Sequence, residues 1–329
     1  MRKVFRGLKR ERNPMSQKKV SVILATRNEL ELLLMTVLSA VEALHDIDGE
    51  VVVVDNSDEQ YCECVKSLLS GQIKDRMVRY IRKQEPSSAA TMEAAAQEAF
   101  GEYIFYTDAH SIIGYDCIIK SLEFFERHKD EPIAFCYTPL QWAHNSSSAR
   151  KMSFRFHRNN MGSWGKMTDY ELKVPFKGMP HMIKKKVYHA IGGYGCLAES
   201  YMAWGGLIPY LGWKPWLLGY ENWAIPDGVT YHFGEYPKCC RSFTKYRLYS
   251  VSGRYQPGQS HAVAAYVVGG EKFLRQEFIP AKMNRYFASV DHALGIAKEV
   301  GSKEREWMLS NQKYSVWELL ENPPWGKDF

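Results

Sequence analysis

The chain has 329 residues, of which 45% are hydrophobic and 24% are charged. These fractions are ordinary for a globular protein and exclude a wholly disordered chain, a collagen-like chain and a coiled coil. The net charge is +6, and it is concentrated in residues 1–19, which carry eight basic residues and one acidic residue.

The basic segment 1–19 is expected to be a flexible tail. Such a tail could bind nucleic acid or an anionic membrane surface, or it could be a solvated leader. The longest apolar runs, such as residues 20–25, are far shorter than the about 20 residues of a membrane-spanning helix. No signal peptide is visible, so we expect a cytoplasmic protein. The seven cysteines lack the paired spacing of a zinc site, and we expect them to be reduced thiols.

From residue 20 onward, hydrophobic runs typical of buried strands alternate with helical spacing of apolar residues. The predicted strands and helices are, in chain order, strand 20–26, helix 29–45, strand 50–55, helix 60–70, strand 77–82, helix 89–100 and strand 103–107. This order predicts an α/β fold with a mostly parallel sheet and right-handed crossovers. Ligands of such sheets bind at the carboxyl ends of the strands.

The second half is less regular, and residues 150–175 cannot be assigned. The elements predicted there are a strand at 132–142, a strand at 180–184, a helix at 185–191, a helix at 199–211, two short strands within 213–233, a loop at 234–260 and a largely helical segment at 261–321. The turn between the two short strands is expected at Pro226-Asp227-Gly228.

Five short motifs follow one another along the chain. They read VSVILATRNE at 20–29, VDNS at 54–57, GEYIFYTDAH at 101–110, IGGY at 191–194 and IPDGVTYH at 225–232. In this order and spacing they resemble GT-A glycosyltransferases of the family 2 type, with features similar to polypeptide N-acetylgalactosaminyltransferases. The resemblance implies a Rossmann-like GT-A catalytic domain at 20–235, followed by a loop and helical extension at 236–329.

Asp108 and His110 lie two residues apart after a predicted strand. A carboxylate and an imidazole in this position can hold one divalent cation, although Thr107 or Asp108 could instead cap a following helix. The resemblance implies that His232 is a third ligand of this metal. Because two of the three ligands are then nitrogens, Mn²⁺ is expected in preference to Mg²⁺.

The resemblance also implies a UDP-sugar donor. Asp55 would accept a hydrogen bond from the uracil, and Thr26, Arg27, Glu29 and Thr107 would line the nucleotide pocket beside Asp108. For Asp55, Arg27 and Glu29 the structural alternative is a helix cap or a charge near a helix N-terminus. Relatives often carry an Arg-Asn pair in the third helix, where this chain has Met92-Glu93.

On the acceptor side, Glu199 occupies the place where family 2 enzymes carry an acidic pair. It is expected to be a shifted catalytic base or a group that positions the acceptor, with a capping role as the alternative. Trp204 is expected to pack against a sugar. Basic residues of the loop after His232, in particular Arg241, would close over the diphosphate. Five further histidines are expected to be structural, namely His144, His157, His181, His189 and His261.

Three functions are therefore compared. The leading one is metal-dependent transfer of a sugar from a UDP-sugar to a hydroxyl of a glycan, a polymer or a hydroxylated base in DNA. The second is nucleotidyl transfer, against which the turn after the first strand has no glycine. The third is a binding module that uses the basic tail on nucleic acid. The helical extension could shape the acceptor site or form a homodimer contact.

Overall fold

The computed structural model describes residues 18–30, 32–75, 78–84, 87–142, 152–155, 163–166, 169–202, 206–233, 259–278, 287 and 289–326. The elements of the first half are β1 (Lys18–Thr26), α1 (Leu33–Ala43), β2 (Gly49–Asp55), α2 (Glu59–Leu68), α3 (Ser70–Lys74), β3 (Val78–Arg82), α4 (Ser88–Glu98), β4 (Gly101–Asp108), β5 (Ser111–Ile113), α5 (Cys117–Arg127), β6 (Ile133–Tyr137) and β7 (Leu140–Trp142).

The second half adds short strands and a group of helices near the C-terminus. Its elements are β8 (Met152–Arg155), β9 (Ser163–Lys166), β10 (Leu172–Lys173), β11 (His181–Lys184), α6 (Lys185–Ala190), α7 (Gly195–Glu199), α8 (Leu207–Leu217), β12 (Glu221–Ala224), β13 (Thr230–His232), α10 (Ser260–Phe273), the π-helix η2 (Leu274–Phe278), α12 (Val290–Asn311) and α13 (Val316–Glu321).

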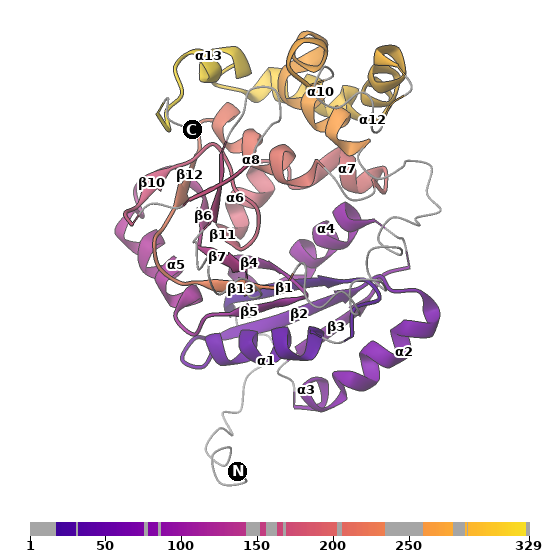
Figure 1. Ribbon diagram of the computed structural model, residues 1–329, viewed down its shortest axis with the longest axis vertical. Helices are drawn as coiled ribbons and strands as arrows, with labels where there is room; N and C mark the ends of the chain where they lie inside the picture. The colour runs from indigo at the N-terminus through magenta and orange to yellow at the C-terminus, as the bar shows by residue number, and fades with distance from the viewer. Residues whose placement is uncertain are drawn as a thin grey trace.

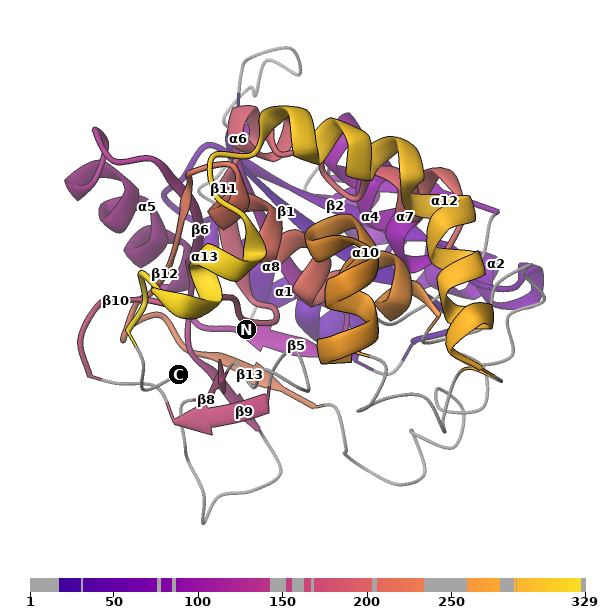
Figure 2. The ribbon, with the colours of Figure 1, turned by 90° about the horizontal axis from the view of Figure 1, so that it is seen from above.

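The main sheet has eight strands in the order β10-β12-β6-β11-β4-β1-β2-β3. Strand β1 pairs in parallel with both β2 and β4, whereas β11 pairs antiparallel with β4 and β6. The predicted mostly parallel sheet is thus confirmed. A second sheet of five strands, β5-β13-β7-β8-β9, lies beside the carboxyl edge of the main sheet (Figure 1, Figure 2).

Each face of the main sheet is covered by helices, because the strand side chains alternate between two cores. Helices α1, α2 and α5 bury residues such as Val22, Val53 and Phe105 on one face. Helices α4, α8, α10 and α12 cover the other face, where Ile23, Val54 and Tyr106 point. Figure 1 shows the C-terminal helices stacked above α8 and α7, with α1, α2 and α3 on the opposite side of the sheet.

The C-terminal helices belong to the same hydrophobic cluster as one face of the sheet. Helix α10 packs against both α8 and α12, and its residues Val263, Val267 and Phe273 are fully buried. The largely helical character predicted for 261–321 is confirmed. None of the helices in the described part of the chain is long and apolar enough to cross a membrane. The described cysteines are free, as expected.

One predicted helix is wrong. The helix predicted at 199–211 is two helices, because α7 ends at Glu199, Tyr201 has a φ of 50°, and α8 begins only after Gly206. Gly206 has a φ of 68°, and a Cβ there would lie 2.7 Å from the backbone nitrogen of His261, so the start of α8 is fixed against the start of α10. The two short strands predicted within 213–233 are confirmed as β12 and β13, which lie on either side of Pro226-Asp227-Gly228.

Other boundaries differ from the expected ones. The strand predicted at 132–142 divides into β6 and β7, which belong to different sheets. The helix predicted at 29–45 begins only at Leu33, with Leu32 as its N-cap residue, and ends at Ala43. The helix predicted at 89–100 ends at Glu98, and Gly101 lies beyond it. Gly101 begins β4, where a Cβ would lie 2.4 Å from the backbone nitrogen of Ser21.

Candidate active site

The pairing of β13 brings His232 to the end of β4. His232 lies opposite Ser111 of β5 in an antiparallel pair, and the Phe233 amide donates to the carbonyl oxygen of His110 at 3.0 Å. Asp108 is the last residue of β4 and lies opposite Ala25 of β1. The register therefore gathers residues 108, 110 and 232 at the carboxyl edge of the main sheet.

Thr36 of α1 holds the turn between β4 and β5. Its hydroxyl donates to the carbonyl oxygen of Ala109 at 2.8 Å and accepts the Ser111 amide proton at 3.0 Å. Ser39, one helical turn later, accepts from the Ile113 amide at 3.0 Å. Helix α1 thus fixes the backbone on both sides of His110.

The side chains of Asp108, His110 and His232 converge. The Nε2 atoms of the two histidines lie 3.0 Å apart, and His232 Nε2 lies 3.1 Å from Asp108 Oδ2. The side chains of Asp108 and His110 are 40% and 26% exposed, so the cluster is open to a ligand from one side. These contacts confirm that the sequence-predicted residues meet.

The environment keeps Asp108 ionised. Burial raises its pKa, but the hydrogen bond from His232 and the electrostatic effect of the neighbouring histidines outweigh burial and lower the pKa to about 2. A group with this pKa is a carboxylate throughout the neutral range. It can therefore serve as an anionic ligand without first losing a proton.

This donor set fits a divalent cation. One ligand atom from each residue lies within 4.8 Å of the others, and two atoms bound to one cation at about 2.1 Å are typically about 3–4 Å apart. One carboxylate oxygen and two imidazole nitrogens suit first-row metals such as Mn²⁺. Among the described residues it is the one cluster of this kind.

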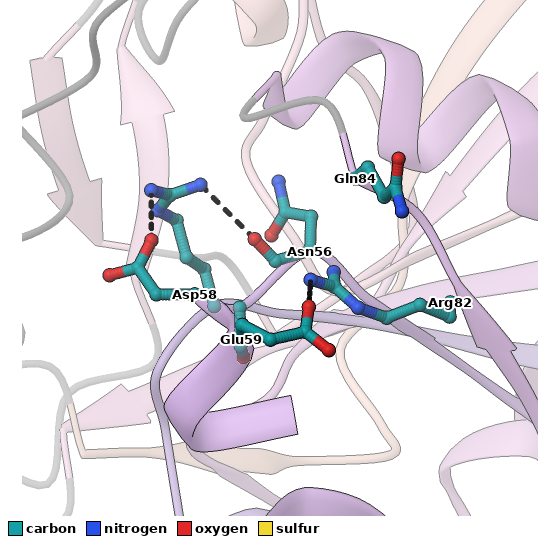
Figure 3. Close-up of a pocket in the computed structure, with 7 residues that line it drawn as sticks. Asn56, Asp58, Glu59, Arg82 and Gln84 are labelled. Atoms are coloured by element: carbon teal, nitrogen blue, oxygen red, sulfur yellow. Dashed lines mark hydrogen bonds and ion pairs between the residues drawn. The ribbon is translucent and has the colours of Figure 1, made fainter. Parts of the chain in front are cut away.

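A pocket of about 340 Å³ opens at the carboxyl ends of β1, β2 and β3 (Figure 3). The residues that line it are Arg27, Asn56, Ser57, Asp58, Glu59, Arg82 and Gln84. Arg27 donates to the carbonyl oxygen of Asn56 and to Asp58, and Arg82 lies 3.6 Å from the carboxylate of Glu59. Side chains of both positive and negative charge therefore line a space that is large enough for a nucleoside.

The pocket and the cluster flank the same strand. Thr26 of β1 lies opposite Asp55 of β2, and Ala25 lies opposite Asp108 of β4. Because neighbouring strands are about 4.8 Å apart, the ends of β2 and β4 are roughly 10 Å apart. That separation is similar to the distance between the base and the phosphates of a nucleoside diphosphate.

Asp55 lies beneath the pocket and is not part of its lining. The residue is fully buried, and its two carboxylate oxygens accept hydrogen bonds from the Ser57 amide at 2.8 Å and the Tyr80 hydroxyl at 2.7 Å. These bonds hold the turn that follows β2. The contact of Asp55 with uracil, which the resemblance implies, stays a prediction.

Two predicted threonines carry buried hydroxyls with no partner in the described structure. Thr26 and Thr107 are 2% and 1% exposed, and neither Oγ1 atom makes a hydrogen bond. The Nε atom of Arg27 is also buried and makes no hydrogen bond. Unpaired polar atoms are rare in buried positions, and their grouping at the strand ends is typical of a ligand site.

Glu29 lies against the cluster and not in the pocket lining. Its carboxylate oxygens are 2.9 and 3.1 Å from Nδ1 of His110. The turn that directs it there was not predicted. Asn28 donates its amide to Ser57 and exchanges side-chain and backbone hydrogen bonds with Asp58.

Sequence reasoning missed Thr36, Asp58, Tyr80 and Arg82. Arg82 is the last residue of β3, and Asp58 is the N-cap residue of α2. The hydroxyl of Thr36 and that of Tyr80 act through contacts distant in sequence, so no local pattern marks them.

The remaining predicted residues are distributed as follows. Glu199 is exposed at the end of α7, while Trp204 and Arg241, with Lys238, Lys245 and Arg247, lie outside the described residues. Met92 is buried, and Glu93 accepts hydrogen bonds from the Tyr188 hydroxyl and the Tyr194 amide, so neither lines the pocket.

The other histidines that were expected to be structural have the following surroundings. His181 is packed among aromatic rings, and burial lowers its pKa to about 3, whereas His261 accepts from the Gly206 amide. His189 is exposed beside the ring of Tyr188. His144 and His157 lie outside the described residues.

Three comparisons place these features among known proteins. The family model described as Glycosyl transferase family 2 matches residues 21–197. An uncharacterised glycosyltransferase of Rickettsia bellii is 24% identical over 123 residues, which cover 37% of this chain and 17% of that protein. The chain therefore spans a small part of this relative's length.

Two solved structures are similar in fold. GalNAc-T7 with UDP, GalNAc and Mn²⁺ matches 93% of this chain and 57% of its own, with a TM-score of 0.64 and 16% identity. TarS 1–349 of S. aureus, in complex with UDP-GlcNAc, matches 93% of this chain and 76% of its own, with a TM-score of 0.50 and 12% identity.

Proposed function

Because the chain belongs to glycosyl transferase family 2, we propose that it transfers a sugar from a UDP-sugar to an acceptor hydroxyl. Its fold is the GT-A arrangement that the motifs implied. The observation that carries the proposal is the convergence of Asp108, His110 and His232 beside a polar pocket at the carboxyl edge of the sheet.

The pocket lined by Arg27, Asn56 and Arg82 would bind the nucleoside of the donor. Asp55 and Tyr80 keep its floor in shape, because their hydrogen bond ties β3 to the turn after β2. The unpaired hydroxyls of Thr26 and Thr107 would form hydrogen bonds with the UDP-sugar, between the polar pocket and the metal-ligand cluster. The fold neighbours that hold UDP or UDP-GlcNAc support a uridine donor.

Asp108, His110 and His232 would hold a divalent cation. When bound, that cation would supply positive charge at the diphosphate, where negative charge develops as the glycosidic bond breaks. The two nitrogen ligands and the Mn²⁺ of the GalNAc-T7 structure support Mn²⁺ over Mg²⁺. The opening beside Asp108 leaves the donor access to the cluster.

Glu199 is the acceptor-side candidate. Its carboxylate is exposed at the end of α7, directly before the left-handed turn at Tyr201. There it would position the acceptor hydroxyl or take its proton as sugar transfer proceeds. Trp204 follows five residues later and would offer an aromatic face to a sugar.

The test is a screen for UDP release across nucleotide sugars, with Mn²⁺ and first without an acceptor. Sugar transfer or hydrolysis releases UDP, whereas nucleotidyl transfer would release pyrophosphate. We expect UDP release by the wild type, and its loss in EDTA and in His232→Ala by on the order of 100-fold.

His45→Ala is the matched control, because His45 is an exposed histidine that pairs with Asp46 beyond the far end of α1. It should leave UDP release unchanged. Pyrophosphate as the product, or a rate in His232→Ala equal to that of the wild type, would contradict the proposal.

A further inference from the structure

We infer that Glu29 is a positioning residue that fixes the ring of the metal ligand His110. This inference rests on the proposed metal site. Both carboxylate oxygens of Glu29 lie within 3.1 Å of Nδ1 of His110, so this nitrogen carries the hydrogen and donates it. The other ring nitrogen, Nε2, then presents its lone pair toward His232 and Asp108.

The contact is built from two independently anchored segments. On one side, the left-handed Asn28 is held by its amide on Ser57 at 2.7 Å and by its side chain on Asp58 at 2.9 Å, which turns the chain so that Glu29 faces β4. On the other side, Thr36 holds the carbonyl oxygen of Ala109. Neither segment needs a ligand to bring the carboxylate to the imidazole.

A carboxylate behind a metal-bound imidazole is a common supporting arrangement. It selects one tautomer and one ring orientation, and removing it typically weakens metal binding about 10–100-fold. The Glu29 side chain is 12% exposed, so its bond to His110 is partly shielded from water. Glu29 is therefore assigned to the cation and not to the base or ribose of the nucleotide.

The experiment measures Mn²⁺ binding from the electron paramagnetic resonance signal of the free ion, with and without UDP. We expect Glu29→Ala to bind Mn²⁺ about 10–100-fold more weakly than the wild type. Its affinity for UDP in EDTA should equal that of the wild type, because Glu29 does not line the pocket. Glu29→Gln keeps an acceptor oxygen without the charge, and should lie between Glu29→Ala and the wild type.

Glu171→Gln is the matched control. Glu171 is also a partly exposed carboxylate that contacts a histidine, His128, at 3.1 Å, but it lies beside α5 and β10. It should bind Mn²⁺ as the wild type does. Circular dichroism verifies that each variant is folded. If Glu29→Ala does not fold, the Mn²⁺ affinity of Glu29→Gln tests the inference in its place.

The outcomes separate the inference from the proposed function. If Asp108→Ala loses Mn²⁺ but the folded Glu29 variants bind it as tightly as the wild type, the positioning role is wrong and the metal site stands. If the Glu29 variants lose UDP affinity in EDTA, Glu29 is a nucleotide ligand. If the wild type binds no Mn²⁺, or Asp108→Ala binds it equally well, both the metal site and the role of Glu29 are wrong.

Discussion

The hydroxyls of Thr26 and Thr107 are the clearest sign, at the scale of single residues, that the strand ends are built for a ligand. A buried hydroxyl without a hydrogen bond costs about 1–3 kcal/mol, a cost that a ligand oxygen or nitrogen would remove. Thr36 has the opposite character, because its hydroxyl already contacts Ala109 and Ser111.

This contrast gives the first prediction. Thr107→Val should leave the free energy of unfolding unchanged or raise it by up to about 1 kcal/mol, because no bond is lost. The same variant should weaken UDP binding by up to about tenfold, which corresponds to one hydrogen bond. Urea denaturation and calorimetry measure the two effects.

Thr36→Val is the control, and it should lower the free energy of unfolding by about 1–3 kcal/mol because the Ser111 amide loses its acceptor. A Thr107→Val protein that is destabilised as much as Thr36→Val would show that the Thr107 hydroxyl belongs to the fold and not to the ligand.

The sequence could predict Asp108, His110 and His232 but not what surrounds them. Strand alternation placed Asp108 at a strand end, and resemblance supplied His232 from 122 residues away. The contact of Glu29 with His110 could not be predicted, because nothing local shows that Asn28 adopts a left-handed conformation. The hydrogen bond from Tyr80 to Asp55 could not be predicted either, because it depends on the pairing of β2 with β3.

At the scale of elements, a buried ion pair joins helices α8 and α12. Lys214 is fully buried, and its Nζ atom lies 2.5 Å from Glu304 and 2.9 Å from the carbonyl oxygen of Gly193. The second oxygen of Glu304 accepts the Cys196 amide of α7. One carboxylate and one ammonium thus hold α7, α8 and α12 together.

Removing one partner should therefore be costly. Lys214→Met leaves the Glu304 carboxylate uncompensated and should lower the free energy of unfolding by about 3–5 kcal/mol. The double variant Lys214→Met with Glu304→Leu should recover most of this loss, since an apolar pair of similar size can replace a buried ion pair. Chemical denaturation of the single and double variants decides. Equal stability of Lys214→Met and the wild type would show that the pair contributes nothing.

The same pair predicts a dependence on pH. Burial raises the pKa of Glu304, but Lys214 and the hydrogen bond from the Cys196 amide outweigh burial. The pKa therefore lies below its usual 4.5. A lowered pKa in the folded state means that the contribution to stability is full above pH 4.5 and is lost as the pH falls through the folded value. The stability gap between wild type and Lys214→Met should therefore narrow in acid, measured by denaturation across that range. A gap that stays constant would contradict this pKa shift.

The type of each element, helix or strand, was easier to predict than the elements against which it packs or pairs. The strands and helices from β1 to β4 follow local apolar spacing, which the sequence contains directly. The break between α7 and α8 does not, because it depends on the close approach of Gly206 to the start of α10, more than 50 residues later. The division of residues 132–142 between two sheets likewise depends on pairing with β11 and β13.

At the scale of the whole molecule, the C-terminal helices and the sheet share one core. Val263, Val267 and Ala297 lie in the same cluster as Ile23 and Tyr106. This arrangement shields α8, whose residues Trp213 and Leu217 are fully buried, from water. Helices α10, α12 and α13 therefore share a hydrophobic core with the sheet.

A chain ended after residue 258 should consequently fail to fold. Each buried side chain of α10 and α12 that is lost removes about 1.5–3 kcal/mol of burial, against a typical total stability of about 5–15 kcal/mol. We expect an aggregated product, or one without a cooperative thermal transition by circular dichroism. A soluble truncated chain that melts as the full chain does would show that residues 259–326 are an independent unit.

The most direct test of the central claim is an anomalous diffraction map at the manganese edge, from crystals grown with UDP and Mn²⁺. The account predicts one strong peak at the carboxyl edge of the sheet, within bonding distance of Asp108, His110 and His232. A map with no peak there, or with the ion held by other residues, would contradict it.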